Sequence, residues 1–596
     1  MSSIQFFTKI SELKKFRVFL FIILAGTLIT CKPSTGSDDD DDPDVDLNGY
    51  NETTFFRTDG PDILNRQGQP VVIKGFGLGG WLLPEGYMFG LNREGYTSVS
   101  DIRENMTDLI GASDTEDWFQ LFRDNFVQEK DIIQMKEWGA DHLRFPFHYD
   151  LFYDIESEQF IDEGFDRLDQ FLIWCKRHRM DVILDMHAAP GAQNDGDISD
   201  SDGTARLWTE PDTYWPITVK IWEEIASRYK DETIIIGYDL INEPVTPFGV
   251  DVGNPLLARL YLELAEAIRK VDENHILFIE GNYYATTFDY LTPPQFQIDN
   301  MVYAFHKYWN ETDQGTIQYL LNLRDQHQIP LWLGESGENS NPWFHETIQL
   351  MEANNIGWNW WTHKKLETIT SPLSAPTNDN YEKVKDYWNG GGPRPSSAEA
   401  RQGLFQMAEE LDMDSNTLKP DVVAALFSPS FGSENVPYTE LSIPGKIDAV
   451  NFDIGMNGVS YNDIDYKRVN GDEVQGTGNT GWEYRNDGVD IQSNSEEVTD
   501  YNVGWTETGE WLEYTVEVTG GTYDIVARIA SGVNGSRFRL TLDGDRVGND
   551  VTVPNTGGFG NWQQVSVGSA TFPEGTHTLK LIVLTGGFNI SLITIQ

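Results

Sequence analysis

The sequence of 596 residues is poor in cysteine, in cations and in long apolar runs. Its two cysteines, Cys31 and Cys175, exclude a fold built on a disulfide scaffold. Lys and Arg total 43 against 94 Asp and Glu, and the net charge of −51 excludes nucleic-acid binding by bulk electrostatics. The apolar run at residues 18–29 is too short to span a bilayer comfortably.

Aromatic residues, in contrast, are abundant, with 18 Trp, 24 Tyr and 32 Phe. An acidic surface rich in rings favours neutral partners over anions, and sugars are neutral partners that stack on rings. The alternative is that the acidic residues only keep the surface soluble.

The amino terminus is typical of a targeting segment. Lys14, Lys15 and Arg17 precede the apolar run, as in a signal peptide, which we place at residues 1–30. The run ends in Leu28-Ile29-Thr30-Cys31, which resembles a bacterial lipobox, although Thr30 stands where that family usually has Gly, Ala or Ser. The resemblance implies that Cys31 carries lipid, which anchors a protein to a membrane without spanning it.

Residues 31–50 are predicted to be a tether. Five consecutive aspartates, Asp38 to Asp42, repel one another and cannot bury a core. Acidic residues soon after a lipidated cysteine also resemble the surface-export signals of Bacteroidetes-type lipoproteins. The resemblance implies an outer-membrane protein at the cell surface, and a plain spacer on the periplasmic face is the alternative.

Residues 51–427 predict an α/β domain of the (β/α)8 TIM-barrel type. Short, nearly continuous apolar runs alternate with segments of helical period, as buried parallel strands and their covering helices do. A doubly wound open sheet is the rival, but no G-x-G-x-x-G follows any strand. The expected strands are residues 71–75, 142–147, 182–187, 234–243, 275–281, 301–308, 330–335 and 357–361.

Six of these strands finish in polar or aromatic side chains. The carboxyl ends of barrel strands carry catalytic groups, so these side chains are predicted to form one convergent ring. Each residue alone has a structural explanation, as a helix cap or a core residue, but the repetition favours function. The ring consists of Arg144, His187, Asn242 with Glu243, His306 with Tyr308, Glu335, and Trp361.

Two carboxylates in the ring suit glycoside hydrolysis. Glu243 and Glu335 follow the fourth and seventh strands, so they can face each other across the barrel mouth. One carboxylic acid would protonate the leaving oxygen, and the other would attack the anomeric carbon or activate water. We assign Glu243 as acid/base and Glu335 as nucleophile.

Other ring members support that pair. Asn242 can bond a sugar hydroxyl, Tyr308 and Arg144 can hold Glu335 ionised, and Trp361 offers a flat apolar face to a pyranose. Metal hydrolysis is the rival chemistry, but the histidines form neither H-x-x-x-H nor H-E-x-x-H. The sequence therefore predicts no metal or cofactor for the barrel.

At this point the barrel resembles glycoside hydrolase family 5. The Asn242-Glu243-Pro244 triplet is similar to its acid/base signature, and Gly334-Glu335-Ser336 to its nucleophile strand. Arg144, His187, His306 and Tyr308 fall where that family keeps its active-site Arg, His, His and Tyr. Three further segments resemble the exo-β-1,3-glucanase branch: residues 77–85, 185–194 and 357–364.

The branch implies that Glu85 and Asn194 contact the sugar at the non-reducing end. Two departures stand against it, because His363 replaces a usual Trp and the loop at residues 88–125 is long and different. A 1,3-linked β-glucan such as laminarin is favoured. A β-1,4-glucan, a mixed-linkage glucan or another β-linked sugar stays open, as does endo or exo action.

Residues 443–596 predict a separate all-β sandwich of the jelly-roll type after a linker at residues 428–442. Alternating apolar residues in runs such as 511–516 and 523–529 are separated by Gly, Asn and Asp turns. No carboxylate pair or nucleophile stands out in this part, so it is predicted to bind.

Several segments of this part resemble carbohydrate-binding modules of family 6: residues 503–514, 553–563 and 586–589. The resemblance implies a sugar clamp made by Tyr484, Trp562 and Asn589. That family often holds structural calcium, but Val450 replaces the usual second acid after Asp448, so calcium is not expected.

The whole sequence thus predicts a lipid-anchored, retaining β-glucan hydrolase with an attached sugar-binding module. Its expected partners are a polysaccharide or oligosaccharide and, through the anchor alone, a membrane, with no nucleic acid. Two alternatives remain: a surface glycan-binding protein whose barrel is catalytically dead, and a transglycosylase that uses the same site.

Overall fold

The computed structural model describes residues 49–247, 255–469, 482–494 and 501–596. The predicted signal peptide, Cys31 and nearly all of the tether at residues 31–50 lie outside the described residues. Among the helices that are described, none combines the length and the apolar character needed to cross a bilayer.

Eight parallel strands close into a barrel in the order β10-β11-β12-β3-β4-β7-β8-β9. Every segment predicted to be a barrel strand overlaps one of them, so the TIM-barrel prediction is confirmed. The strands are β3 (Lys74–Gly77), β4 (His142–His148), β7 (Asp181–Ala188), β8 (Ile235–Asp239), β9 (Ile276–Glu280), β10 (Met301–Lys307), β11 (Leu331–Ser336) and β12 (Gly357–Trp361).

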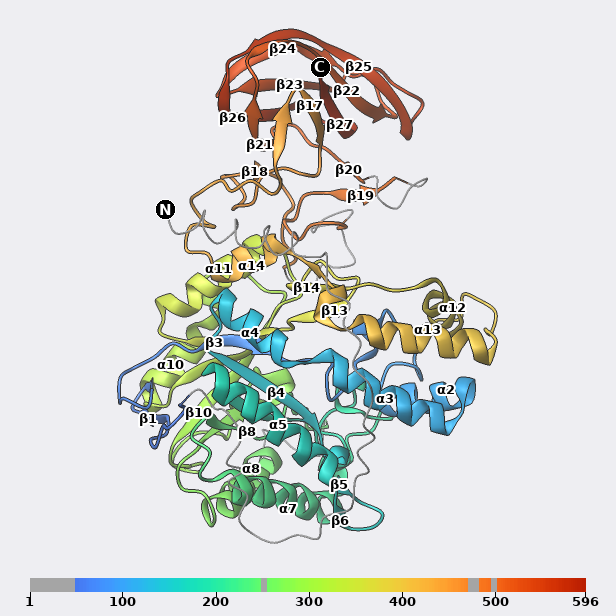
Figure 1. Cartoon of the computed structure of the whole chain (residues 1–596). Helices are drawn as coiled ribbons and strands as arrows, with labels where there is room; N and C mark the ends of the chain where they lie inside the picture. The colour runs from blue at the N-terminus through green and yellow to red at the C-terminus, as the bar shows by residue number, and fades with distance from the viewer. Residues whose placement is uncertain (1–48, 248–254, 470–481, 495–500) are drawn as a thin grey trace. The chain divides into compact units, whose positions relative to one another are not determined.

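Helices connect successive strands and cover the outside of the barrel (Figure 1). Helix α5 shows why they pack there: its apolar residues recur at helical spacing and are buried against the strands. The main covering helices are α4 (Glu129–Trp138), α5 (Asp162–His178), α7 (Pro211–Tyr229), α8 (Pro255–Arg269), α10 (Gln318–His327) and α11 (Asn341–Ala353).

The segment after β3 differs from the expectation of one long loop. Residues 88–125 include α2 (Val99–Ile110) and most of α3 (Ala112–Phe126). Both helices pack against α13 (Ser397–Glu410), which explains why they form although the sequence reading assigned no helix there. Other helices of this part are α6 (Arg206–Thr209), α9 (Asn282–Ala285), α12 (Asp379–Trp388) and α14 (Pro420–Phe427). A small sheet contains β13 (Lys364–Leu366), β14 (Leu373–Ala375) and β15 (Thr417–Leu418).

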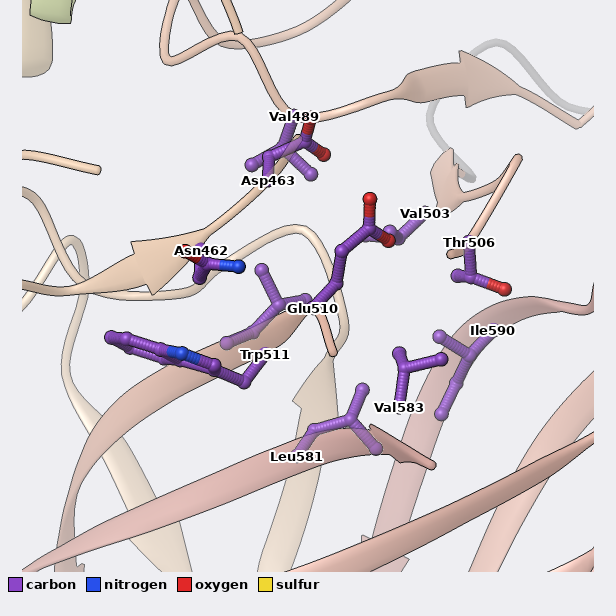
Figure 2. A pocket seen from close by; sticks show the side chains of 11 residues that line it. Asn462, Asp463, Val489, Val503, Thr506, Glu510, Trp511, Leu581, Val583 and Ile590 are labelled. Carbon is purple, nitrogen blue, oxygen red and sulfur yellow. The ribbon is translucent and has the colours of Figure 1, made fainter. Parts of the chain in front are cut away.

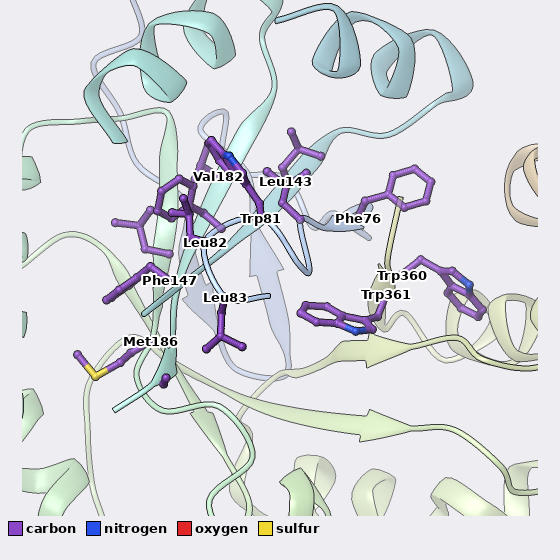
Figure 3. Close-up of a cluster of buried hydrophobic side chains, with 14 of the residues drawn as sticks. Phe76, Trp81, Leu82, Leu83, Leu143, Phe147, Val182, Met186, Trp360 and Trp361 are labelled. Atoms are coloured by element: carbon purple, nitrogen blue, oxygen red, sulfur yellow. The ribbon is translucent and has the colours of Figure 1, made fainter. Parts of the chain in front are cut away.

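A hydrophobic cluster supports the mouth of the barrel (Figure 3). Trp81, Leu82 and Leu83 follow β3 and are almost fully buried. Successive tryptophans of β12 point to opposite sides, as strand geometry requires, and Trp360 packs edge-on against Phe344 of α11. Trp361 is therefore left on the side of the barrel mouth.

The carboxy-terminal part is a sandwich of two sheets around its own core. One sheet contains β16 (Leu441–Ile443), β18 (Tyr461–Asn462), β21 (Trp511–Val518), β23 (Arg537–Leu542), β24 (Asp545–Thr552) and β26 (Gly575–Thr585). The other contains β17 (Gly445–Asp448), β19 (Ile491–Ser493), β20 (Tyr501–Val503), β22 (Gly521–Ser531), β25 (Gly558–Phe572) and β27 (Asn589–Ile595).

The all-β prediction is confirmed, with one correction to its start. Strand β16 begins at Leu441, inside the segment expected to be a linker at residues 428–442. Leu441 lies beside Val516 in a parallel ladder with β21, and this pairing draws the end of the linker into the sheet.

Candidate active site

The structure brings the predicted ring of polar residues together at the barrel mouth, but Arg144 is the third of the seven residues of β4, so its predicted place at a strand end is wrong. Arg144 lies on β4, His187 on β7, His306 on β10 and Glu335 on β11. Trp361 ends β12, while Tyr308 follows β10 by one residue. The fourth strand differs from expectation, because β8 ends at Asp239, so Asn242 and Glu243 stand on the loop that follows it.

Glu335 is held by a cation and a phenol. Nη1 of Arg144 donates to its Oε1 at 2.6 Å, and the hydroxyl of Tyr308 donates to its Oε2 at 3.0 Å. The carboxylate of Glu335 is 94% buried, so both contacts act in a site with little solvent screening. This arrangement fixes both carboxylate oxygens of Glu335 in position, as a nucleophile needs.

Arg144 is fully buried among carboxylates. Besides Glu335, its guanidinium lies 3.2 Å from Asp185, 2.9 Å from Asp239 and 3.0 Å from Glu280. Burial opposes the charge of Arg144, but the surrounding carboxylates outweigh it and raise its pKa further. Burial also raises the pKa of Asp185 and Asp239 well above the usual range. None of these three acids is among the site residues predicted from the sequence.

Glu243 is held in a strained backbone conformation, with φ of +45°. Its backbone N–H donates to Oε2 of Glu280 at 2.6 Å, and its carbonyl accepts from Nδ2 of Asn194 at 3.0 Å. Its side-chain Oε1 lies 2.7 Å from Nδ1 of His306. Contacts from three different strand ends or loops therefore fix the position of this carboxyl group.

His306 connects the two assigned carboxylates. Nδ1 lies 2.7 Å from Glu243 and 3.5 Å from Glu335, and Nε2 lies 3.2 Å from Glu280. Burial opposes protonation of His306, but the negative charges of Glu280 and Glu335 outweigh it and raise its pKa. One ligand atom each from Glu243, His306 and Glu335 lies within 4.8 Å of the others.

That spacing would also suit metal ligands, which the sequence analysis rejected for lack of a motif. Nδ1 of His306 lies 2.7 Å from Oε1 of Glu243, a direct hydrogen-bond distance that leaves no room for an ion between these two atoms, and Nε2 faces Glu280. The arrangement thus fits an acid and a nucleophile better than a metal centre.

A second group of predicted residues forms one wall of the site. Oε1 of Glu85 is buried and has no hydrogen-bond partner among the described residues, and it lies 3.8 Å from Nε2 of His187. Nδ1 of His187 lies 2.8 Å from Asp185. Burial raises the pKa of Glu85 and lowers that of His187 to about 4. The wall is therefore polar, and Oε1 of Glu85 is left to bond a ligand.

Other predicted sugar contacts are engaged with protein atoms. The imidazole of His187 stacks on the indole of Trp361, with centroids 4.9 Å apart, and a Cβ atom at Gly79 would meet that indole at 2.4 Å. The amide of Asn194 supports Glu243, and Oδ1 of Asn242 accepts from Arg144 at 2.9 Å. Direct sugar contacts of these residues stay predictions.

The predicted clamp of the sandwich is not assembled as one cluster by any contact that the structure records. The ring of Tyr484 packs on Tyr501 with centroids 4.8 Å apart. Trp562 lies on β25 beneath the guanidinium of Arg528, at 4.9 Å. The buried amide of Asn589, at the start of β27, donates to the carbonyl of Phe559 at 3.1 Å. Their common sugar-binding role stays a prediction.

The sandwich also contains a small acidic hollow (Figure 2). Asp463 and Glu510 line it together with apolar residues such as Val489 and Ile590. Burial, followed by the charge of Asp463, raises the pKa of Glu510 to about 8. Burial likewise raises the pKa of Asp463 to about 7. The hollow is too narrow for a sugar. Asp463 and Glu510 are therefore expected to affect the stability of the sandwich and not sugar binding.

Comparison with known proteins agrees with this division. Residues 100–366 match the family model of the cellulases of glycosyl hydrolase family 5. Residues 485–595 match the model of carbohydrate binding module family 35, where the sequence resembled family 6. A solved structure, the C-terminal CBM6 of LamC from Zobellia galactanivorans, is 37% identical over 18% of this chain and 87% of its own, with a TM-score of 0.17.

Two curated relatives resemble the barrel. A beta-xylosidase of Phanerodontia chrysosporium is 33% identical over 43% of this chain and 52% of its own length. Endoglucanase C of Acetivibrio thermocellus is 27% identical over 41% of this chain and 86% of its own.

A probable glucan 1,3-beta-glucosidase A of Aspergillus fumigatus is 24% identical over 36% of this chain and 51% of its own length. The chain thus spans about half the length of the beta-xylosidase and of this glucosidase. The barrel segment carries a glycoside hydrolase family 5 domain, a class of O-glycosyl hydrolases, and a carbohydrate-binding module follows it.

Proposed function

We propose that this protein is a retaining glycoside hydrolase that cleaves β-glucosidic bonds in a β-glucan. The observation that carries the proposal is the approach of Glu243 and Glu335, whose oxygens come within 4.8 Å of each other. Retaining enzymes hold their carboxyl groups about 5–5.5 Å apart, whereas inverting enzymes need about 6.5–9.5 Å to admit a water.

In the first step, Glu335 attacks the anomeric carbon while Glu243 gives its proton to the leaving glycosidic oxygen. Arg144 and Tyr308 donate hydrogen bonds to Glu335 and hold its carboxylate in position for the attack. A covalent glycosyl-enzyme forms, and the aglycone leaves with the proton of Glu243.

In the second step, Glu243 removes a proton from water, and that water attacks the anomeric carbon and releases Glu335. The same group therefore serves as acid and then as base. His306 contacts the carboxyl group of Glu243, and Glu280 fixes the backbone of Glu243. The product sugar keeps the β configuration.

We favour a 1,3-linked, laminarin-like substrate. The glucan 1,3-beta-glucosidase among the relatives supports this linkage, as do the buried Glu85 and Asn194 beside the catalytic pair. A β-1,4- or mixed-linkage glucan is the second candidate, because endoglucanase C is matched over most of its length. A product time course on laminarin, mixed-linkage glucan and cellulose tests both linkage and endo or exo action.

Two rival functions predict other results in the same assay. A dead barrel that only binds glycans would turn over none of these substrates and no aryl β-glucoside. A transglycosylase would build products longer than the substrate at high substrate concentration, because the covalent intermediate passes to a sugar hydroxyl.

For the location, the proposal is a protein that is anchored through lipid on Cys31 to the outer membrane and exposed at the cell surface. The acidic tether after Cys31 supports it. Replacing Cys31 by Ala is expected to release the protein from the membrane fraction, and an unchanged membrane fraction would contradict the anchor. The carbohydrate-binding module, with similarity to families 35 and 6, would hold the enzyme on its polymer.

A further inference from the structure

A hollow of about 320 Å³ opens beside the loop that follows β7. Its size is at the lower end of the range of about 300–1,000 Å³ for small-molecule pockets, enough for a monosaccharide unit. The walls come from the start of α2, the segment after β4, the loop after β7 and the start of α7. Tyr149, Tyr214, Asp101, Ser199, Asp200 and Arg206 are among the lining residues.

One wall of this hollow is tied to the catalytic centre. Oγ of Ser199 donates to Oδ1 of Asn194 at 2.9 Å, and Nδ2 of Asn194 donates to the carbonyl of Glu243 at 3.0 Å. Ala189, which also lines the hollow, stands two residues after His187. A single loop therefore separates the hollow from the site of bond cleavage.

The hollow offers rings as well as polar groups. Both Tyr149 and Tyr214 are half-buried and line it. Gly191 has φ of +81°, and a Cβ atom there would meet the ring of Tyr214 at 2.6 Å, so only glycine lets the loop lie against this ring. Because the loop at Gly191 packs against the ring of Tyr214, this flat apolar surface is already fixed in place, and binding a ligand on it costs little entropy.

Most charges around the hollow are already paired. Asp200 accepts hydrogen bonds from Ser100 and contacts His148, and Asp202 pairs with Arg206 at 2.5 Å. Burial opposes protonation of His148, but Asp150 and Asp200 raise its pKa to about 10. The half-buried carboxylate of Asp101 has no recorded side-chain hydrogen bond or ion pair within the described ranges, so it can accept from a ligand.

This chemistry selects among ligand classes. The carboxylates of Asp101, Asp200 and Asp202 repel anions. A group of three metal-ligating side chains at suitable spacing is recorded among the described residues only at the catalytic centre. A neutral molecule with an apolar face and several hydroxyls fits, since rings stack on the face and a carboxylate accepts from the hydroxyls.

We propose that the hollow binds a pyranose unit of the glycan substrate that lies outside the bond being cleaved. The inference rests on the proposed function, and it adds a specificity-determining subsite formed by Asp101, Tyr149 and Tyr214. A glycan whose side branch or continuing chain reaches this subsite is held more tightly than a short aryl glycoside.

The test compares kcat/KM on laminarin with kcat/KM on an aryl β-glucoside for Asp101→Asn and Tyr214→Ala. Losing one charge-assisted hydrogen bond is expected to lower the polymer-to-aryl ratio about tenfold in Asp101→Asn. Glu104→Gln is the matched control, because Glu104 is an exposed acid on the same helix outside the hollow. Its ratio should equal that of the wild type. Unchanged ratios in both folded pocket variants would overturn the subsite.

A binding measurement separates this subsite from the proposed function. If the wild type cleaves no β-glucan or aryl glucoside, calorimetry with gluco-, manno- and xylo-hexaoses in the Glu335→Gln background tests the hollow by itself. Weaker binding on adding Asp101→Asn, but not on adding Glu104→Gln, supports the subsite. Equal binding by both double variants, or no binding of any hexaose, overturns it.

Discussion

Glu280 connects the acid/base residue, its histidine and the central arginine, and replacing it by Gln should move the pH profile. Its Oε2 accepts the backbone N–H of Glu243 at 2.6 Å, and its Oε1 lies 3.0 Å from Arg144 and 3.2 Å from His306. Burial opposes ionisation of Glu280, but the charges of His306 and Arg144 outweigh it and lower its pKa. It therefore supplies a permanent negative charge.

The direction in which Glu280→Gln should move the pH profile follows from that negative charge. The group of Glu243, His306 and Glu280 must keep a proton for the leaving oxygen, and protons in such a group belong to the group as a whole. Removing one negative charge makes the group lose its proton at lower pH. A contact charge inside a buried site moves a pKa by roughly 1–3 units, and each unit corresponds to about 1.36 kcal/mol.

The assay is the pH dependence of kcat/KM on an aryl β-glucoside with a poor leaving group. Glu280→Gln should shift the alkaline limb by about one unit or more to lower pH. Asp272→Asn is the control, because Asp272 bonds Tyr238 and His275 just before the other end of the same strand. Asp272→Asn should lower thermal stability without moving the alkaline limb of the pH profile. An alkaline limb that stays in place, or moves up, in folded Glu280→Gln would refute the reasoning.

Four other predictions concern the catalytic pair and the module. Glu335→Ala should abolish turnover in a folded protein. In steady-state assays, Glu243→Ala should slow the hydrolysis of substrates with poor leaving groups more than that of substrates with good ones. Equal losses on both kinds of substrate would contradict the assignment of Glu243 as the acid. Trp562→Ala should lower the polymer-to-aryl ratio of kcat/KM, measured on insoluble glucan, and an unchanged ratio would speak against a binding role. Glu510→Gln should raise the melting temperature more at pH 8 than at pH 5, seen by calorimetry. The folded-state pKa of Glu510 is about 8 and the unfolded-state pKa is about 4.3, so Glu510 costs stability that grows as pH rises from the unfolded to the folded value. An equal gain at both pH values would be inconsistent with a titrating Glu510.

The barrel could be predicted because its strands are buried on both faces. Such strands are continuous apolar runs, and each of the eight runs became a strand, although β3 starts at Lys74 instead of residue 71. The helices α2 and α3 were missed because their packing against α13, nearly 300 residues later, decides that they form. Local patterns do not contain such contacts.

The catalytic pair could be predicted because strand ends meet at one edge of a barrel. The same rule applies to Glu280, which ends β9, although it is not among the residues predicted from the sequence. Asp185 and Asp239 lie inside segments predicted to be apolar strands, and nothing in such a run indicates that a single acid has a role in the site. Their role is visible only once Arg144 lies between them.

The roles of Asn194 and Trp361 could not be read from the residue types. An amide near a catalytic pair can bond sugar or backbone, and here the amide of Asn194 holds the carbonyl of Glu243. An indole can stack on a sugar or on a neighbouring ring. Here the indole of Trp361 stacks on the imidazole of His187. These outcomes depend on distances of a few ångströms that only the folded chain defines.

The most direct measurement of the two-carboxylate account is the configuration of the first product. Proton NMR of an aryl β-glucoside hydrolysis, recorded before mutarotation, distinguishes the two anomers of the released glucose. The carboxyl oxygens of Glu243 and Glu335 lie within 4.8 Å of each other, a spacing that fits a retaining enzyme. The β-anomer should therefore appear first and the α-anomer later. An α-anomer that appears first would mean direct attack by water and would contradict a covalent intermediate on Glu335.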